Sequence, residues 1–164
     1  MRILGIDPGT ARVGYGIIDL DADNYNVVDC GCITTKANTP LEHRLSEIAD
    51  DIESLILAHS PDVAAVEELF FSKNTKTALS VAHARGVILE KIQRHNIPLY
   101  SYNPMVIKKA LCSDGKAKKP QMQRITQLLL RLAELPTPDD TADALAIALC
   151  HGNTHRNKSL YMQT

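Results

Sequence analysis

The chain has 164 residues, of which 45% are hydrophobic and 23% are charged, and its formal net charge is −1. This length is enough for one domain with a proper hydrophobic core and too short for two ordinary domains. No stretch approaches the ~20 consecutive apolar residues that a membrane-spanning helix needs, and the N-terminus lacks the apolar run and cleavage site of a signal peptide. We therefore expect a cytoplasmic protein without a membrane partner.

Charge is distributed unevenly along the sequence. Between Lys73 and Arg131 there are twelve Lys or Arg residues and two acids, whereas the rest of the chain has six basic residues and seventeen acids. A basic half beside an acidic half is typical of a protein that binds a polyanion such as a nucleic acid. A solvated helix surface explains any single lysine, but it explains the asymmetry of the whole segment less well.

The four cysteines indicate neither a zinc site nor a redox motif. Cys30, Cys32, Cys112 and Cys150 include no Cys-x-x-Cys pair, which both of those sites require. We expect each of them to be a buried thiol that acts as a small hydrophobic side chain.

Alternating apolar runs and turn residues predict the order of the elements. Asp7-Pro8-Gly9 forms a turn after the first strand, and Pro61-Asp62 ends the first amphipathic helix. The expected strands cover residues 3–6, 13–20, 26–34, 63–66 and 97–102, and the expected helices cover about 41–59, 74–95, 104–111, 120–133 and 139–151.

This order describes an α/β protein with a mixed five-stranded sheet. Three strands with short connections form an antiparallel meander, and the later strands, each preceded by a helix, add in parallel, so that helices flank the sheet. No linker divides the chain. We expect one domain over residues 1–151, followed by a polar, frayed tail over residues 152–164.

Acidic side chains lie where this topology exposes them. Asp7 ends the first strand and Glu67 ends the fourth, so they meet at one sheet edge if these strands are neighbours. Asp140 and Asp143 begin the last helix three positions apart and share one face. Taken alone, Asp7 can be a turn residue and Asp140 an N-cap. Asp143 lies in an apolar helix and therefore needs a partner.

Together the four acids predict a metal-dependent nuclease. Four carboxylates that converge in a partly desolvated cleft, with no Lys or Arg nearby, repel one another strongly unless they bind divalent cations. Oxygen ligands without nitrogen or sulfur donors favour Mg²⁺ or Mn²⁺ over zinc. Two such ions ~3.5–4 Å apart are the usual clamp for in-line attack on a phosphodiester.

Five segments, in order, match the pattern of a known family. They are Leu4-Gly5-Ile6-Asp7-Pro8-Gly9, Gly14-Tyr15-Gly16, Val66-Glu67-Glu68-Leu69-Phe70, Ala84-Arg85-Gly86 and Ala142-Asp143-Ala144-Leu145-Ala146-Ile147-Ala148. Over residues 1 to about 151 the chain resembles the RuvC crossover junction endodeoxyribonucleases. The resemblance implies a ribonuclease-H-like fold and a Holliday junction resolvase.

The resemblance also implies a detailed activity. It implies a homodimer that binds four-way junction DNA and nicks two strands of like polarity at symmetric positions, leaving 5′-phosphate and 3′-hydroxyl ends. The expected cofactor is Mg²⁺, with Mn²⁺ as a substitute and two ions per active site. The expected process is DNA recombination and the repair of DNA damage, with branch-migration proteins of the same system as further partners.

Functional residues follow from the matched positions. The catalytic and metal-binding acids fall on Asp7, Glu67, Asp140 and Asp143, and the DNA-binding residues on Phe70, Lys108 and Lys119. Glu67 rather than Glu68 matches the family, and strand alternation agrees that only one of the two faces the site. The long helix from Asn74 corresponds to the family's dimer contact. The loop beginning at Cys112 lacks a glycine that the family usually has near Ser113.

Three other functions remain open at this point. The start Gly5-Ile6-Asp7-Pro8-Gly9-Thr10 also resembles the phosphate loop of actin-like kinases and ATPases, although those proteins need a second similar domain. RuvX-type nucleases of ribosomal RNA maturation share the fold but are typically shorter. A non-catalytic junction-binding module is the third alternative.

Overall fold

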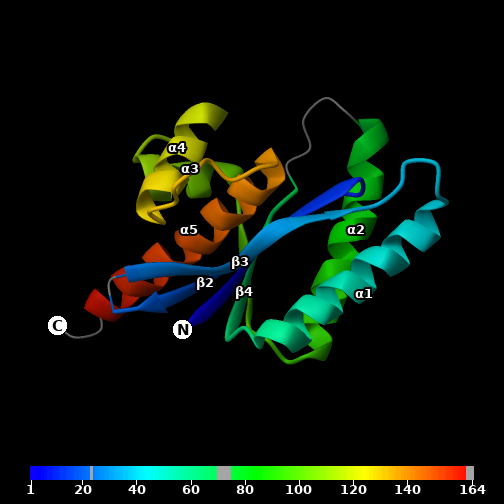
Figure 1. Cartoon of the computed structure of the whole chain (residues 1–164), viewed down its shortest axis with the longest axis horizontal. Helices are drawn as coiled ribbons and strands as arrows, with labels where there is room; N and C mark the ends of the chain where they lie inside the picture. Colours follow the sequence, from blue (N-terminus) through cyan, green and yellow to red (C-terminus); the bar gives the residue numbers. More distant parts are fainter. Residues whose placement is uncertain (23, 70–74, 162–164) are drawn as a thin grey trace.

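The computed structural model describes residues 1–22, 24–69 and 75–161 (Figure 1). Within these residues five strands form one sheet in the order β3-β2-β1-β4-β5. They are β1 (Arg2–Asp7), β2 (Arg12–Asp21), β3 (Asn24–Thr34), β4 (Val63–Glu67) and β5 (Leu99–Tyr102). β1 pairs antiparallel with β2 and parallel with β4, while β4 and β5 are also parallel. The predicted mixed sheet is confirmed, with β1 and β4 as neighbours.

Helices cover both faces of the sheet. One face is covered by α1 and α2, and the other by α5 together with α3 and α4 (Figure 1). The helices are α1 (Leu41–His59), α2 (Thr75–Arg94), α3 (Pro104–Cys112), α4 (Lys119–Leu129) and α5 (Asp139–Tyr161).

Two predicted helix ends are wrong. α4 ends at Leu129 rather than near residue 133, because Arg131 adopts a left-handed conformation with φ 52°. α5 continues through Gly152 to Tyr161 instead of ending near His151. A β-carbon on Gly152 would lie 2.6 Å from Tyr25, so this glycine accommodates a ring from β3 rather than ending the helix. The expected frayed tail is therefore helical up to Tyr161, and the division into domain and tail at residue 151 stays a prediction.

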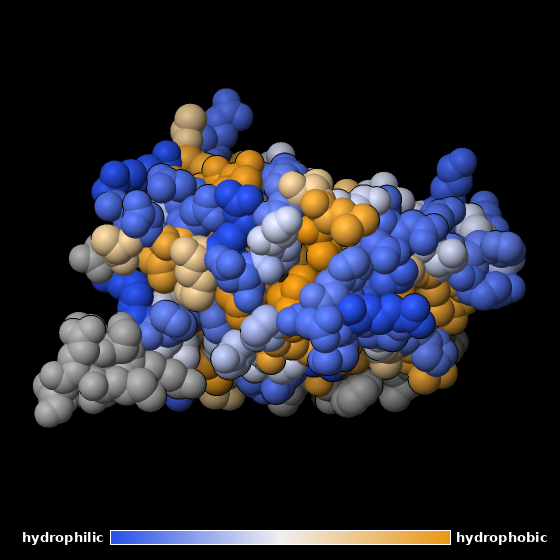
Figure 2. Space-filling model, turned by 90° about the horizontal axis from the view of Figure 1, so that it is seen from below, coloured by the Kyte–Doolittle hydropathy of each residue, from blue (hydrophilic) through white to orange (hydrophobic). Residues whose placement is uncertain are grey.

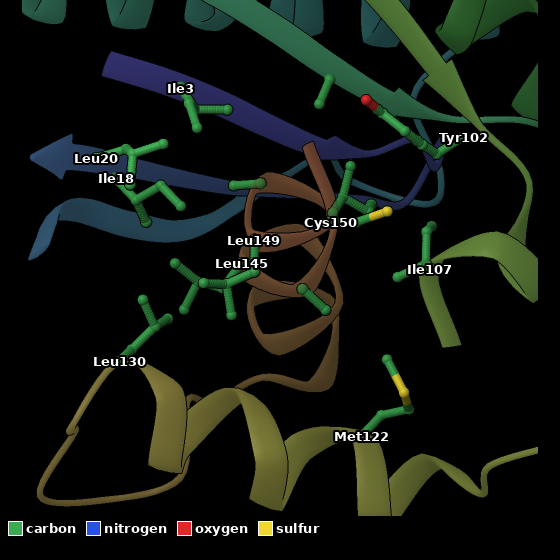
Figure 3. Packing of buried hydrophobic residues seen from close by; sticks show 14 of the residues in the cluster. Ile3, Ile18, Leu20, Tyr102, Ile107, Met122, Leu130, Leu145, Leu149 and Cys150 are labelled. Atoms are coloured by element: carbon green, nitrogen blue, oxygen red, sulfur yellow. The ribbon is translucent and has the colours of Figure 1, made fainter. Parts of the chain in front are cut away.

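Buried residues form two layers because successive side chains of a strand point to opposite faces. In β1, Leu4 and Ile6 pack toward α1 and α2, whereas Ile3 packs toward α5. Figure 3 shows this second layer, in which Leu145 and Leu149 of α5 lie between the strands and α4. The apolar run of α5 is therefore enclosed on both sides, as its composition predicts.

Two glycines set how closely α5 approaches the sheet. A β-carbon on Gly5 of β1 would lie 2.3 Å from the carbonyl oxygen of Ala144, and one on Gly14 of β2 would lie 1.9 Å from the carbonyl oxygen of Asp140. Real β-carbons do not approach other atoms this closely, so the backbone of α5 lies directly on β1 and β2 only because both positions lack side chains. This contact fixes the first turn of α5 beside the end of β1.

The surface is that of an ordinary folded domain. On the face shown in Figure 2, hydrophobic residues reach the surface in separate groups between hydrophilic ones. In the described part of the chain, no helix is both long and apolar enough to cross a membrane.

Candidate active site

The four predicted acids come from three elements that meet at one edge of the sheet. Asp7 is the last residue of β1 and Glu67 is the last residue of β4. These strands are parallel neighbours, with Ile6 opposite Val66, so both carboxylates leave the same edge. Asp140 lies in the first turn of α5 and Asp143 follows one turn later. The charges of Glu67, Asp140 and Asp143 all act on the carboxyl group of Asp7. The neighbouring Glu68, by contrast, is exposed.

Crowding of the carboxylates changes their protonation. Burial raises the pKa of Asp7 to about 8, with repulsion from Glu67, Asp143 and Asp140 acting in the same direction. Burial and repulsion from Asp143 raise the pKa of Glu67 to about 6, against a hydrogen bond with Asp7 and the charges of Lys108 and Lys119. Without a cation, burial and repulsion therefore favour the protonated form of Asp7, which is hydrogen-bonded to Glu67.

Two basic side chains contact the other two acids, which corrects the expectation that no Lys or Arg lies nearby. Arg12 Nε lies 3.0 Å from Asp140 Oδ2, and Lys119 Nζ lies 2.9 Å from Asp143 Oδ2. Lys119 Nζ also lies 3.3 Å from Asp139 Oδ2. Arg12 begins β2 and Lys119 begins α4, so only the folded chain brings them to α5.

A cavity of about 240 Å³ opens beside the acids. Glu67 and Asp143 line it together with Lys108, Lys119 and apolar side chains that include Ile107. The two predicted DNA-binding lysines therefore lie beside two of the acids in one cavity. The predicted aromatic contact, Phe70, lies outside the described residues.

The donor set fits a hard divalent cation. It consists of carboxylate oxygens alone, and it carries more negative charge than its two basic neighbours neutralise. Asp140 Oδ2 is buried and, despite its closeness to Arg12, makes no hydrogen bond in the described structure. In the described residues, this cluster included, no three His, Cys, Asp or Glu side chains are already arranged around one point. To hold a cation, the carboxylates would therefore have to turn toward it.

Sequence reasoning missed two arginines at this edge. Arg12 pairs with Asp140, and Arg85 of α2 donates to the main-chain carbonyl of Glu67. The motif Ala84-Arg85-Gly86 was a signal for Arg85, although nothing in the sequence shows which atom it contacts. For Arg12 the only signal was its place a few residues after the turn that follows β1, which predicts a role at the site less specifically than the motif does for Arg85.

Comparison with known proteins matches this chain to one family. Its sequence profile, described as "Crossover junction endodeoxyribonuclease RuvC", matches residues 3–151. A curated protein of this description from Petrotoga mobilis is 48% identical over 157 residues, which is 96% of each chain. Another, from Chloroflexus aggregans, is 49% identical over 154 residues and 94% of each chain.

Solved structures give the same result. The Thermus thermophilus RuvC structure superposes with a TM-score of 0.89 at 32% identity and covers 96% of this chain and 97% of its own. The structure of T. thermophilus RuvC in complex with a Holliday junction substrate has a TM-score of 0.87 at 30% identity and covers 96% of both chains. The yeast mitochondrial resolvase Ydc2, with a TM-score of 0.66 at 16% identity, shares the fold.

The raised pKa of Asp7 predicts a pH-dependent stability of the metal-free protein. Between pH of about 4 and about 8 the folded state binds more protons than the unfolded chain, so the free energy of unfolding falls as the pH rises. In EDTA we expect the melting temperature to fall from pH 5 to pH 8, and Asp7→Asn to be more stable than the wild type at pH 8 by about 1 kcal/mol or more.

Thermal unfolding followed by circular dichroism measures this effect. The exposed Asp50→Asn is the matched control and should behave like the wild type. A wild-type melting temperature that rises from pH 5 to pH 8, or an Asp7→Asn protein that is less stable than the wild type at pH 8, would contradict the raised pKa.

Proposed function

Because the chain belongs to the RuvC family of crossover junction endodeoxyribonucleases, we propose that it resolves four-way (Holliday) DNA junctions by paired symmetric nicks. The observation that carries the proposal is the convergence of four carboxylates beside Lys108 and Lys119. A related protein was solved in complex with a Holliday junction substrate. The match over residues 3–151 leaves the actin-like and RuvX-type alternatives without support.

The carboxylates would hold Mg²⁺, or Mn²⁺ in its place, with two ions per active site. Asp7 is the most crowded of the acids, because Glu67, Asp143 and Asp140, which lies in the first turn of α5, all act on it. Two such ions would supply an activated water and stabilise the leaving oxygen, in a cleavage that would leave 5′-phosphate and 3′-hydroxyl ends. The raised pKa of Asp7 supports this proposal, because burial and repulsion both disfavour the charged carboxylate, and a dication at the cluster would offset both.

The chain's own basic residues would bind the phosphate backbone. Lys119 is paired with Asp143 and Asp139, lines the cavity and is about half exposed, so its ammonium group can transfer from carboxylate to phosphate when DNA binds. Lys108 lines the same cavity. Phe70 would stack on a base near the branch point, since every base offers an aromatic face. Phosphate contacts of this kind weaken as salt is added.

Cleavage of a synthetic mobile four-way junction tests the proposal. In Asp143→Asn one anionic ligand is lost, so we expect nicking in Mg²⁺ to fall by more than the roughly 100-fold that loss of an outer-shell partner causes. Junction affinity in EDTA should stay close to that of the wild type, because the lysines remain. The exposed Asp50→Asn is the matched control and should cut normally. Cleavage that survives excess EDTA, or an Asp143→Asn protein that cuts like the wild type, would overturn the metal mechanism.

A homodimer through α2 completes the proposed enzyme, because two symmetric nicks need two sites. Ala84, Ile88 and Ile92 bury one face of α2 within the chain. Elsewhere on the helix Leu79 is 65% exposed, and a β-carbon on Gly86 would meet nothing within 4 Å. A glycine inside a helix costs about 1 kcal/mol relative to alanine. Close approach of a second copy of the chain at this point would explain why the helix has a glycine there.

The substitution Gly86→Ala tests whether the surface of α2 around Gly86 is a dimer interface or is exposed to solvent. If a partner helix approaches there, the added methyl group should weaken the dimer by about tenfold or more, as measured by sedimentation equilibrium. If the surface is free, the substitution should stabilise the protein by about 1 kcal/mol without changing its mass. Gly115→Ala, where an added β-carbon meets only flexible side chains, is the matched control. A wild-type protein that is monomeric at micromolar concentration would contradict the dimer.

The cellular setting follows from the substrate. The enzyme would act in the cytoplasm on junctions formed during DNA recombination and the repair of DNA damage. Branch-migration proteins of the same system would supply junctions at the positions where it cuts.

A further inference from the structure

One arginine ties α2 to the edge of the sheet that carries Glu67. Arg85 Nε donates a hydrogen bond to the main-chain carbonyl oxygen of Glu67 over 3.0 Å, and its Nη2 donates to Ser101 Oγ over 2.9 Å. Glu67 ends β4, and Ser101 lies in β5 opposite Val66. A single guanidinium group therefore joins two neighbouring strands at the point where β4 ends.

The anchor for this guanidinium is rigid. Ala84 and Ile88, on either side of Arg85 in α2, are both fully buried beneath the sheet. Side chains of a helix lean toward its N-terminus, so Arg85 reaches from the middle of α2 toward the sheet edge that carries the acids. Arginine suits this position because its planar group keeps two donors in a fixed relative geometry, which lysine does not.

The contacted atom controls the direction of the Glu67 side chain. The peptide group that follows Glu67 is held at both ends, because its N–H, on Glu68, donates to Tyr102 O over 2.9 Å and its carbonyl oxygen accepts from Arg85. With both ends held, the plane of this peptide group is fixed, which limits rotation at the Cα atom that carries the Glu67 side chain. A metal ligand must be held to within roughly 0.5 Å and 10–20°, and a long glutamate side chain amplifies any rotation of its backbone.

Arg85 differs from the charged groups that act on the carboxylate itself. Asp143, Asp7, Lys108 and Lys119 are the groups that interact with the Glu67 carboxyl. Arg85 instead binds the main chain, where it affects the orientation of the side chain rather than its charge. Loss of Arg85 should therefore change how well Glu67 is aimed at a cation.

We propose that Arg85 is a positioning residue that holds the main chain at Glu67, so that this carboxylate enters the cation site in a fixed orientation. The inference rests on the proposed function, in which Glu67 is a metal ligand. It gives the Ala84-Arg85-Gly86 motif a role, and it connects the helix proposed for the dimer contact to the active site.

Binding of Mn²⁺ alone, measured by titration calorimetry on the full-length, metal-stripped protein, tests the role. Removal of an outer-shell partner typically weakens metal binding 10–100-fold, and we expect a change of that size in the dissociation constant for Arg85→Ala. Arg85→Lys keeps one hydrogen-bond donor but loses the fixed pair of donors of the guanidinium group. Its dissociation constant should lie between those of the wild type and Arg85→Ala. The matched control is Arg94→Ala on the same helix, whose side chain pairs with Glu90 and is 73% exposed. It should change the constant less than twofold.

Cleavage gives a second, independent readout. In Arg85→Ala the Mg²⁺ concentration for half-maximal nicking should rise more than the rate at saturating Mg²⁺ falls, since excess metal compensates for a poorly aimed ligand. A general loss of structure would lower the saturating rate and leave the half-maximal concentration unchanged. That second result would overturn the inference.

A double-mutant cycle separates positioning from other effects. In a Glu67→Gln background, Arg85→Ala should weaken Mn²⁺ binding no further, because the ligand that it aims is already lost. Equal losses in both backgrounds, or an unchanged constant in Arg85→Ala, would overturn the inference while leaving the proposed function intact. A wild-type protein that binds no Mn²⁺ would overturn both.

Ser101→Ala provides an alternative test of the role of Arg85 if the Arg85→Ala protein does not fold. This variant keeps Arg85 but removes one of its two partners. We expect Mn²⁺ binding to weaken severalfold, less than for Arg85→Ala and with a normal melting temperature. Unchanged binding in a folded Ser101→Ala protein, together with unchanged binding in Arg85→Lys, would overturn the role of the guanidinium.

Discussion

Contact between the backbone of α5 and two strands is the constraint on which the rest of the site depends. At Gly5 and Gly14 no side chain separates the helix from the sheet, so carbonyl groups of α5 lie directly on β1 and β2. The first turn of α5 is thereby held beside the end of β1, and Asp140 and Asp143 reach Asp7. Larger residues at either glycine would push the helix outward and separate acids that are distant in the sequence.

The electrostatic state of the site follows from that geometry. Carboxylates that the packing holds together need compensation, and the metal-free protein supplies it in two ways. The environment of Asp7 favours its protonated form, while Arg12 and Lys119 pair with the acids of α5. In the proposed enzyme a dication replaces the proton, and Lys119 becomes available to the phosphate backbone. A stable core thus carries a locally unfavourable cluster, as is common at functional sites.

Local patterns predicted the parts of the fold that depend on near neighbours. Apolar runs that end in acids identified Asp7 and Glu67, and the parallel pairing of β1 with β4 put both at one edge. Distant contacts were not predictable in the same way. α5 continues through Gly152 because Tyr25 packs there, and Arg12 meets Asp140 because α5 lies on β2. Lys108 and Lys119 were predicted from the family resemblance and not from the local sequence pattern.

Anomalous diffraction from crystals grown with Mn²⁺ is the most direct test of the central claim, that packing of α5 on the sheet creates one cation site from three elements. The account predicts an anomalous peak bounded by the carboxylates of Asp7, Glu67 and Asp143, which is lost in Asp143→Asn. A peak at another place in the molecule, or a wild-type crystal in which these three carboxylates face different directions around an empty centre, would contradict it.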